Sequence, residues 1–195
     1  MERTLKIAVI SLVTNTAFAA YHFVFGILWS SQWLLNVGSY YLVLSLVRFV
    51  VLRTKNEERF VTRFTGWMLM ILSVTLAGTV VLSLLIETGQ KFHMILMIAI
   101  ATYAFTKITL ATINFIKSRH STSAKLITLR NISFADAFVS IFALQRSMLV
   151  SFDGMTETEI VIMNAVLGCA VCVVVFVLGI NLVINKKIIF KTLKD

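Results

Sequence analysis

The feature that most constrains this chain is a series of six apolar stretches, each long enough to cross a bilayer as a helix. A transmembrane helix needs about 20 mostly apolar residues, because the hydrocarbon core is about 30 Å thick and each helical residue rises about 1.5 Å. The sequence therefore predicts an all-α polytopic membrane protein, in which residues 1–195 form a single domain of six transmembrane helices. The predicted spans are 5–29, 33–52, 64–86, 94–116, a fifth that ends near Val150, and 160–184.

Two of these spans leave an alternative open. The apolar core of the fifth begins at Ile132, but the helix could begin near Ser123, because no Gly or Pro interrupts 124–131. The first span has a basic start, and Ala17-Phe18-Ala19 resembles the cleavage site of a signal peptide. Its apolar run continues through Trp29, beyond the short apolar core of a signal peptide, which favours an uncleaved membrane helix.

The distribution of charge predicts the orientation in the membrane. The net charge of +9 would suggest a nucleic-acid partner in a soluble protein, but 58% of the residues are hydrophobic and only 14% are charged. Lys and Arg gather in the connections 53–63 and 117–130 and after the sixth span, whereas 30–32 and 151–159 contain none. The positive-inside rule then places both termini in the cytoplasm. We expect a multi-pass protein of the plasma (inner) membrane, with the lipid bilayer and no nucleic acid as its partner.

Polar side chains inside the spans are the candidates for function, because ionisable groups there are costly and rarely face lipid. Asp136 shares a helical stripe with Ser140, and it lies at the depth of Lys107 if the fifth helix begins near Ser123. We expect Lys107 and Asp136 to form a buried pair, so that removing both charges costs less than removing one.

The pair has two interpretations: a proton or cation relay, or a structural contact that fixes helix register. Arg48, the one rival partner for Asp136, and Arg146 lie nearer the ends of their spans and are expected to extend toward the membrane surfaces.

Other residues in the spans carry weaker signals. Asn15 and His22 share a face of the first span, and a lone His is expected to be a buried hydrogen-bonding group, because metal sites need several converging ligands. No GxSxG, HExxH or phosphate-loop motif is present, so we expect neither an enzyme nor a cofactor. Small residues expected at helix contacts are Gly38, Gly78, Gly168 and Gly179.

The turn between the first two spans carries a resemblance to a known family. Gly26-Ile27-Leu28, Ser31 and Leu34-Leu35 resemble a motif of the cation diffusion facilitator family of cation efflux transporters. In the fifth span, Asp136 followed by Ser140 resembles the family's second metal-binding segment. The resemblance implies a bundle of six spans with both termini inside, a possible homodimer, and transport of a small solute or ion.

The sequence departs from that family at the metal ligands. Three of its four ligand positions fall on Tyr40, Leu44 and Ile132, and only Asp136 keeps a carboxylate. One carboxylate cannot make a four-coordinate zinc site, so no metal is expected and a conventional zinc exporter is improbable. The chain is also expected to lack the family's cytoplasmic metal-sensing domain. The candidate intramembrane polar site comprises Asp136, Lys107, Tyr40, Ser140, His22 and Asn15.

Two functions therefore compete. A transporter-like protein would have a cavity that reaches Asp136 from the cytoplasm. A non-transporting scaffold or regulatory subunit on the same fold would have Asp136 occupied by Lys107 and no accessible cavity. Whether the space between the second and fifth spans is open or filled separates the two hypotheses.

The topology is tested by cysteine labelling in a variant whose native Cys169 and Cys172 are replaced by Ala. A membrane-impermeant thiol reagent added from outside should modify a cysteine placed at Gly154 and miss one placed at Glu57, because the charge asymmetry puts 53–63 in the cytoplasm. The reverse labelling pattern would contradict the orientation.

Overall fold

The computed structural model describes residues 2–54, 58–85, 94–118, 123–151 and 155–184. The labelling positions 57 and 154 and the basic segment 186–194 lie outside these residues. Within them the chain is helical, without strands, and five of its helices are long and apolar enough to cross a membrane. An all-α membrane protein is therefore confirmed. The helices are α1 (Glu2–Leu28), α2 (Gln32–Arg53), α3 (Glu58–Leu85), α4 (Met94–Ser118), α5 (Ala124–Ser151) and α6 (Glu157–Ile184).

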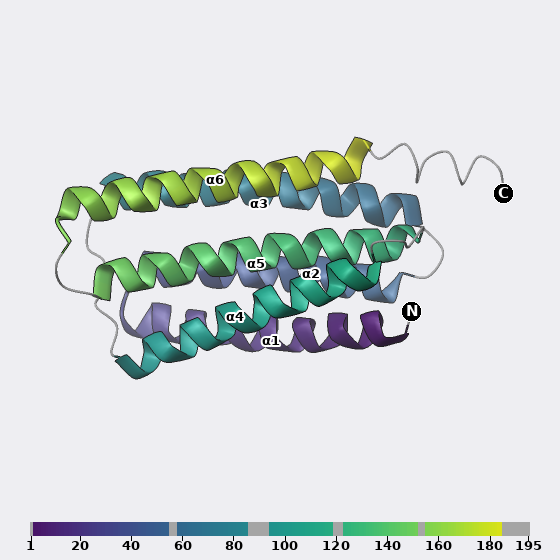
Figure 1. The fold of residues 1–195 in the computed structure, drawn as a ribbon, viewed down its shortest axis with the longest axis horizontal. Helices are drawn as coiled ribbons and strands as arrows, with labels where there is room; N and C mark the ends of the chain where they lie inside the picture. Colours follow the sequence, from purple (N-terminus) through teal and green to yellow (C-terminus); the bar gives the residue numbers. More distant parts are fainter. Residues whose placement is uncertain (1, 55–57, 86–93, 119–122, 152–154, 185–195) are drawn as a thin grey trace.

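Figure 1 shows the helices as three layers of two, with α2 and α5 between the pair α1 and α4 and the pair α3 and α6. The central helices α2 and α5 are the most buried of the five apolar ones, because each is covered on both sides. In α4 the described residues contribute a shorter apolar helix, Ile100–Ile113. The beginning of α1 and the end of α6 lie at the same end of the bundle.

The helix limits follow from local chemistry that hydropathy does not capture. α5 begins at Ala124, so the longer of the two predicted starts is correct. α6 begins at Glu157, earlier than predicted, because Thr156 and Glu159 form a capping box. The Glu159 carboxylate accepts from the Thr156 N–H at 2.9 Å, and the Thr156 hydroxyl accepts from the Glu159 N–H at 3.4 Å. α3 likewise begins in its polar segment, at Glu58.

The turn from α1 to α2 is built by the residues that carry the family resemblance. Ser30 adopts a left-handed conformation with φ of 50°, and the Ser31 N–H donates to the Gly26 carbonyl at 2.9 Å, which closes the last turn of α1. A Cβ at Gly26 would lie 2.9 Å from the Leu35 side chain, so only glycine lets α2 pack this closely on α1. The local motif therefore specifies a helical hairpin and carries no chemistry of its own.

Glycine also sets the contact between α3 and α6. A Cβ at Gly66 would lie 2.8 Å from the Gly179 carbonyl oxygen, and a Cβ at Gly179 would lie 2.8 Å from the Gly66 carbonyl oxygen. Small residues allow this backbone approach in the membrane, where packing takes over from the hydrophobic effect. Gly38 and Gly168 also pack closely, as predicted, but the prediction for Gly78 is wrong: a Cβ there meets no atom within 4 Å, because Gly78 faces outward from the bundle.

Two glycine substitutions test this packing. Gly66→Ala should lower the free energy of unfolding in detergent by about 1–3 kcal/mol, because its Cβ meets a backbone carbonyl that cannot rotate away. The matched control Gly78→Ala should be neutral or stabilising by up to about 1 kcal/mol, because alanine favours a helix and the space is open. Thermal unfolding of both variants measures the difference, and equal melting temperatures would contradict it.

Candidate functional site: an intramembrane charged centre

The charged centre is formed by Asp136 of α5, whose carboxylate contacts two basic side chains from other helices. Lys107 Nζ of α4 lies 2.7 Å from Asp136 Oδ2, so the predicted contact between these residues is confirmed. Arg48 Nη2 of α2 lies 3.4 Å from the same oxygen. The exposed fractions of the Arg48, Lys107 and Asp136 residues are 0%, 3% and 1%, so all three charges are removed from the surroundings of the bundle.

Neutral donors and acceptors surround this carboxylate. Asn15 Nδ2 donates to Asp136 Oδ2 at 3.0 Å, and the Asn15 carbonyl oxygen accepts from the Tyr103 hydroxyl at 3.1 Å. The Ser11 hydroxyl lies 3.4 Å from Asp136 Oδ2 and accepts from Lys107 Nζ at 3.3 Å and from Arg48 Nη1. Burying a polar group is costly unless it is hydrogen-bonded, so α1 stabilises a centre to which it contributes no charge. All of these contacts are to Oδ2, and Asp136 Oδ1 is buried without a hydrogen-bond partner in the described part of the chain.

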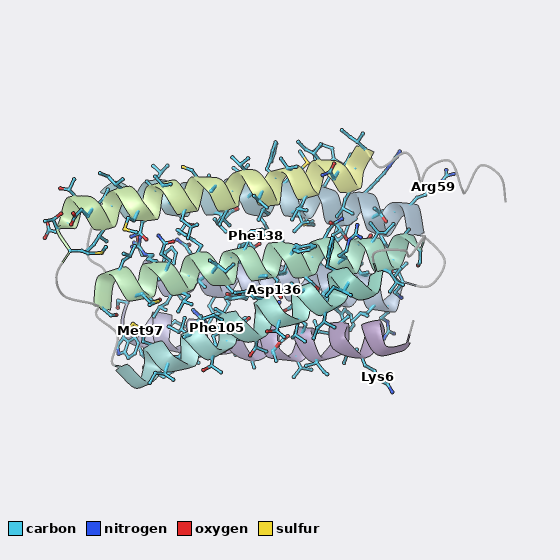
Figure 2. All side chains as sticks on the ribbon, viewed as in Figure 1. Lys6, Arg59, Met97, Phe105, Asp136 and Phe138 are labelled. Carbon is cyan, nitrogen blue, oxygen red and sulfur yellow. The ribbon has the colours of Figure 1, made fainter. Side chains whose placement is uncertain are left out.

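The centre lies far from both ends of the bundle. α5 extends over 124–135 before Asp136 and over 137–151 after it, and Figure 2 shows Asp136 near the middle of the long axis. Each of the helices α1, α2, α4 and α5 contributes a side chain to it. A change of charge on any member is therefore felt by four helices at once.

The prediction for Arg48 is wrong, whereas Arg146 lies beside Trp33 at the start of α2. Arg48 does not extend toward the membrane surface: it is fully buried and reaches inward to Asp136, because an ion pair there compensates a carboxylate that lipid cannot solvate. Arg146 is 8% exposed, and its guanidinium lies 4.4 Å from the centroid of the Trp33 ring. The aromatic face supplies part of the stabilisation that water would have given.

The remaining predicted residues lie around the centre without contacting Asp136 Oδ2. The Ser140 hydroxyl donates to the Asp136 carbonyl oxygen at 2.8 Å and shares a 3.0 Å hydrogen bond with the Tyr41 hydroxyl. His22 Nδ1 lies 2.8 Å from the Phe18 carbonyl, and the ring packs on Phe18 and Tyr41, as expected of a buried hydrogen-bonding group. The Tyr40 hydroxyl is buried and has no hydrogen-bond partner in the described part of the chain.

Ser11 was missed from the sequence, whereas Arg48 was considered as a rival partner for Asp136 and Tyr103 shares a predicted helical stripe with Lys107. Ser11 lies one helical turn before Asn15 on the same face of α1, so extending that polar stripe would have found it. Tyr103 lies one turn before Lys107 on α4, and its ring centroid is 5.1 Å from Lys107 Nζ. Arg48 was expected to extend toward the surface instead, because a basic residue near a span end is also what the positive-inside rule produces.

The charges of the centre do not balance. Asp136 is the one acidic residue inside the predicted spans, and it faces both Lys107 and Arg48. A structural ion pair would be neutral, whereas this group carries one positive charge in excess if all three residues are ionised. The other acidic residues are Glu2, Glu57, Glu58, Glu87, Asp153, Glu157, Glu159 and Asp195.

At the level of Asp136, the described side chains between α2 and α5 have almost no exposed surface: Arg48 is 0% exposed, and Tyr41, Asp136 and Ser140 are each 1% exposed. A pocket of about 20 Å³ lies elsewhere, between α2, α3 and α5, and Asp136 is not among its lining residues. This volume is close to the space of a single water molecule. The pocket is lined by Trp33, Asn36, Val37, Tyr40, Thr75, Leu76, Thr79, Val139, Phe142 and Ala143.

Comparison with known protein families and with curated proteins finds no match for this sequence. The geometry of the charged centre is therefore the observation that bears on function.

The unequal roles of the three charges predict unequal costs of substitution. Asp136→Leu should lower the free energy of unfolding by about 3–5 kcal/mol, because it leaves both buried basic groups without a counter-charge. Lys107→Met should cost less than about 2 kcal/mol, because Arg48 and Asp136 remain as a neutral pair. Unfolding by denaturant in detergent measures both.

Multiple substitutions complete this test. The Lys107→Met/Asp136→Leu double variant should recover less than an isolated pair would, because Arg48 is then unpaired. Adding Arg48→Met should restore much of the stability, since all three desolvated charges are gone. Equal losses in the two single variants, or no recovery in the triple variant, would show that Arg48 is not part of the centre.

Proposed function

We propose that the protein is a membrane transporter of a small solute or ion, with Asp136, Lys107 and Arg48 as its coupling centre. The single observation that supports this is that two basic side chains share one acidic partner, Asp136, in a centre buried midway along the bundle. Ionisable groups inside a membrane domain are costly to bury, and they are found at ion pathways and proton relays. Four helices contact the centre, so its charge state can bias how they pack.

The proposal includes six membrane spans, with α4 as the sixth, and both termini in the cytoplasm of a plasma-membrane protein. Its support is the length of α4, the shared end of α1 and α6 in Figure 1, and the basic connections. The resemblance to cation diffusion facilitators agrees with this count and with a possible homodimer. Membership of that family stays a proposal.

Zinc and related metals are not the proposed substrate. Leu44 and Ile132, which take ligand positions of the resembled family, are fully buried in the apolar core, and neither side chain can bind a cation. Tyr40 contributes only a neutral hydroxyl. Among the residues that the structure describes, no three His, Cys, Asp or Glu side chains lie together as a metal site would require.

A second candidate function is supported by a different observation. Asp136 is only 1% exposed and its Oδ2 is fully engaged, as expected of a non-transporting scaffold or regulatory subunit. The same closure would occur in the occluded state of a transporter. The closed space around Asp136 is therefore the outcome expected of the scaffold, and the transporter requires that the centre also opens, which a flux measurement detects.

Proteoliposomes test the proposed function with gradients of Na⁺, K⁺, Mg²⁺, Zn²⁺ and Cl⁻, each imposed with and without a pH gradient. Wild-type protein should give a flux for at least one of these conditions, with Zn²⁺ alone giving none. Asp136→Asn should abolish the flux, because the carboxylate is the one buried counter-charge of the centre.

The matched control is Thr106→Ala, because Thr106 lies next to Lys107 in the sequence. The exposed Thr106 hydroxyl donates to the Thr102 carbonyl of its own helix. This variant should keep the wild-type flux. Folded wild-type protein that gives no flux under any of these conditions would favour the scaffold.

A further inference from the structure

Resting on the proposed function, we propose that the coupling ion is the proton and that Lys107 carries it. Lys107 Nζ alternates between amine and ammonium, while Arg48 and Asp136 stay ionised as a permanent pair. The inference comes from the imbalance of charge on Asp136: two basic side chains contact one carboxylate oxygen, and all three residues are almost completely buried.

The chain offers no second carboxylate to balance the centre, since every other acidic residue lies outside the predicted spans. An unpaired charge in a medium of low dielectric constant is so costly that ionisable groups there neutralise instead. The centre therefore becomes neutral when one of its two basic groups gives up a proton.

The chemistry of the two basic groups decides which one does so. A guanidinium keeps its proton throughout the range in which proteins function, whereas a buried lysine readily becomes a neutral amine. Arg48, whose Nη2 lies 3.4 Å from Asp136 Oδ2, remains the partner of this carboxylate in both forms of Lys107. Lys107 is thus the member of the centre whose protonation can change.

The groups that face Lys107 are compatible with both of its forms. Asp136 faces it from α5, Arg48 from α2 and Ser11 from α1. On α4 itself, the centroid of the Tyr103 ring lies 5.1 Å from Lys107 Nζ. The amine can donate to Asp136 and accept from the Ser11 hydroxyl. The ammonium can donate to both residues and gains the Tyr103 ring face, which lowers the cost of the protonated state.

Two more titratable rings lie near this set without contacting Nζ. The Tyr41 ring lies 5.6 Å from the Tyr103 ring, centroid to centroid, and its hydroxyl is hydrogen-bonded to Ser140. The His22 ring lies 5.8 Å from the Tyr41 ring and its Nδ1 is engaged by the Phe18 carbonyl. Neither ring supplies a negative charge to balance Arg48 and Lys107 together.

The proton step balances with water as the proton donor and acceptor. On one side of the membrane the Lys107 amine lone pair takes a proton from hydronium, forming an N–H bond and raising the charge of the centre by one. On the other side an N–H bond breaks, its electron pair stays on nitrogen, and water takes the proton. With Lys107 protonated, the closed centre carries an uncompensated positive charge and is unstable. This favours opening of the bundle where α4 contacts α1, a contact made by Tyr103 with Asn15 and by Lys107 with Ser11.

Magnetic resonance of protein labelled with ¹³Cε- and ¹⁵Nζ-lysine, in lipid nanodiscs, tests the protonation directly and does not depend on transport. At pH 7 one lysine signal, identified by its loss in Lys107→Met, should have the chemical shifts of a neutral amine and should move to ammonium values on acidification. Lys125, which donates to the Leu52 carbonyl at 3.0 Å, is the internal control, and its signal should be unchanged in Lys107→Met.

Arg48→Gln gives the decisive comparison, because it removes the excess charge without touching Lys107. In this variant the Lys107 signal should shift to ammonium values at pH 7, since Lys107 is then the one cation beside Asp136. An ammonium signal for wild-type Lys107 from pH 6 to pH 10 would overturn the inference. If that signal moved when chloride was added, a bound anion would balance the centre instead.

The flux and resonance measurements separate failure of this inference from failure of the proposed function. A neutral Lys107 in a protein that moves neither ions nor protons would leave the charge argument intact and refute transport. If Asp136→Asn abolished the flux but Lys107 stayed an ammonium at every pH, the protein would still be a transporter, and the proposal that Lys107 carries the proton would be refuted.

Discussion

The structure depends on the contact between the Asp136 carboxylate and the two cations that share its Oδ2 atom. Asp136 is the one acidic residue inside the predicted spans, so Lys107 and Arg48 have no alternative counter-charge. A broken buried ion pair costs about 3–5 kcal/mol, which is of the order of a whole domain's net stability. The positions of α2, α4 and α5 are therefore tied to one another through a single side chain.

The two halves of the bundle are held together by different physics. On one side, α3 and α6 approach until Gly66 and Gly179 meet backbone to backbone, and that contact uses dispersion and close fit. On the other side, α1 and α4 meet through Tyr103, Lys107 and their partners on α1. The close contact of Gly66 with Gly179 allows one packing of α3 on α6, whereas the strength of a contact between ionisable groups depends on their protonation. The half that contains Asp136 is thus the half suited to conformational change.

Arg48 shows how burial changes the meaning of a basic residue near a span end. In lipid, such a side chain extends to the surface because water solvates the guanidinium there. In this bundle Arg48 lies on the inward face of α2, where Asp136 is within reach and where the Ser11 hydroxyl accepts a second N–H. The direction of the Arg48 side chain therefore follows from the face of α2 on which it lies. That face is set by the rotation of α2 about its own axis relative to α5.

The sequence by itself determined the helices and the membrane class, because length, hydropathy and the absence of proline are properties of local segments. It also predicted the contact between Lys107 and Asp136, since two opposite charges at one depth are costly unless they meet. Only the tertiary structure decided that Arg48 joins them and that Ser11 supports them. Their inclusion depends on how α1 and α2 are rotated about their axes relative to α4 and α5, and this rotation results from packing between helices far apart in the chain.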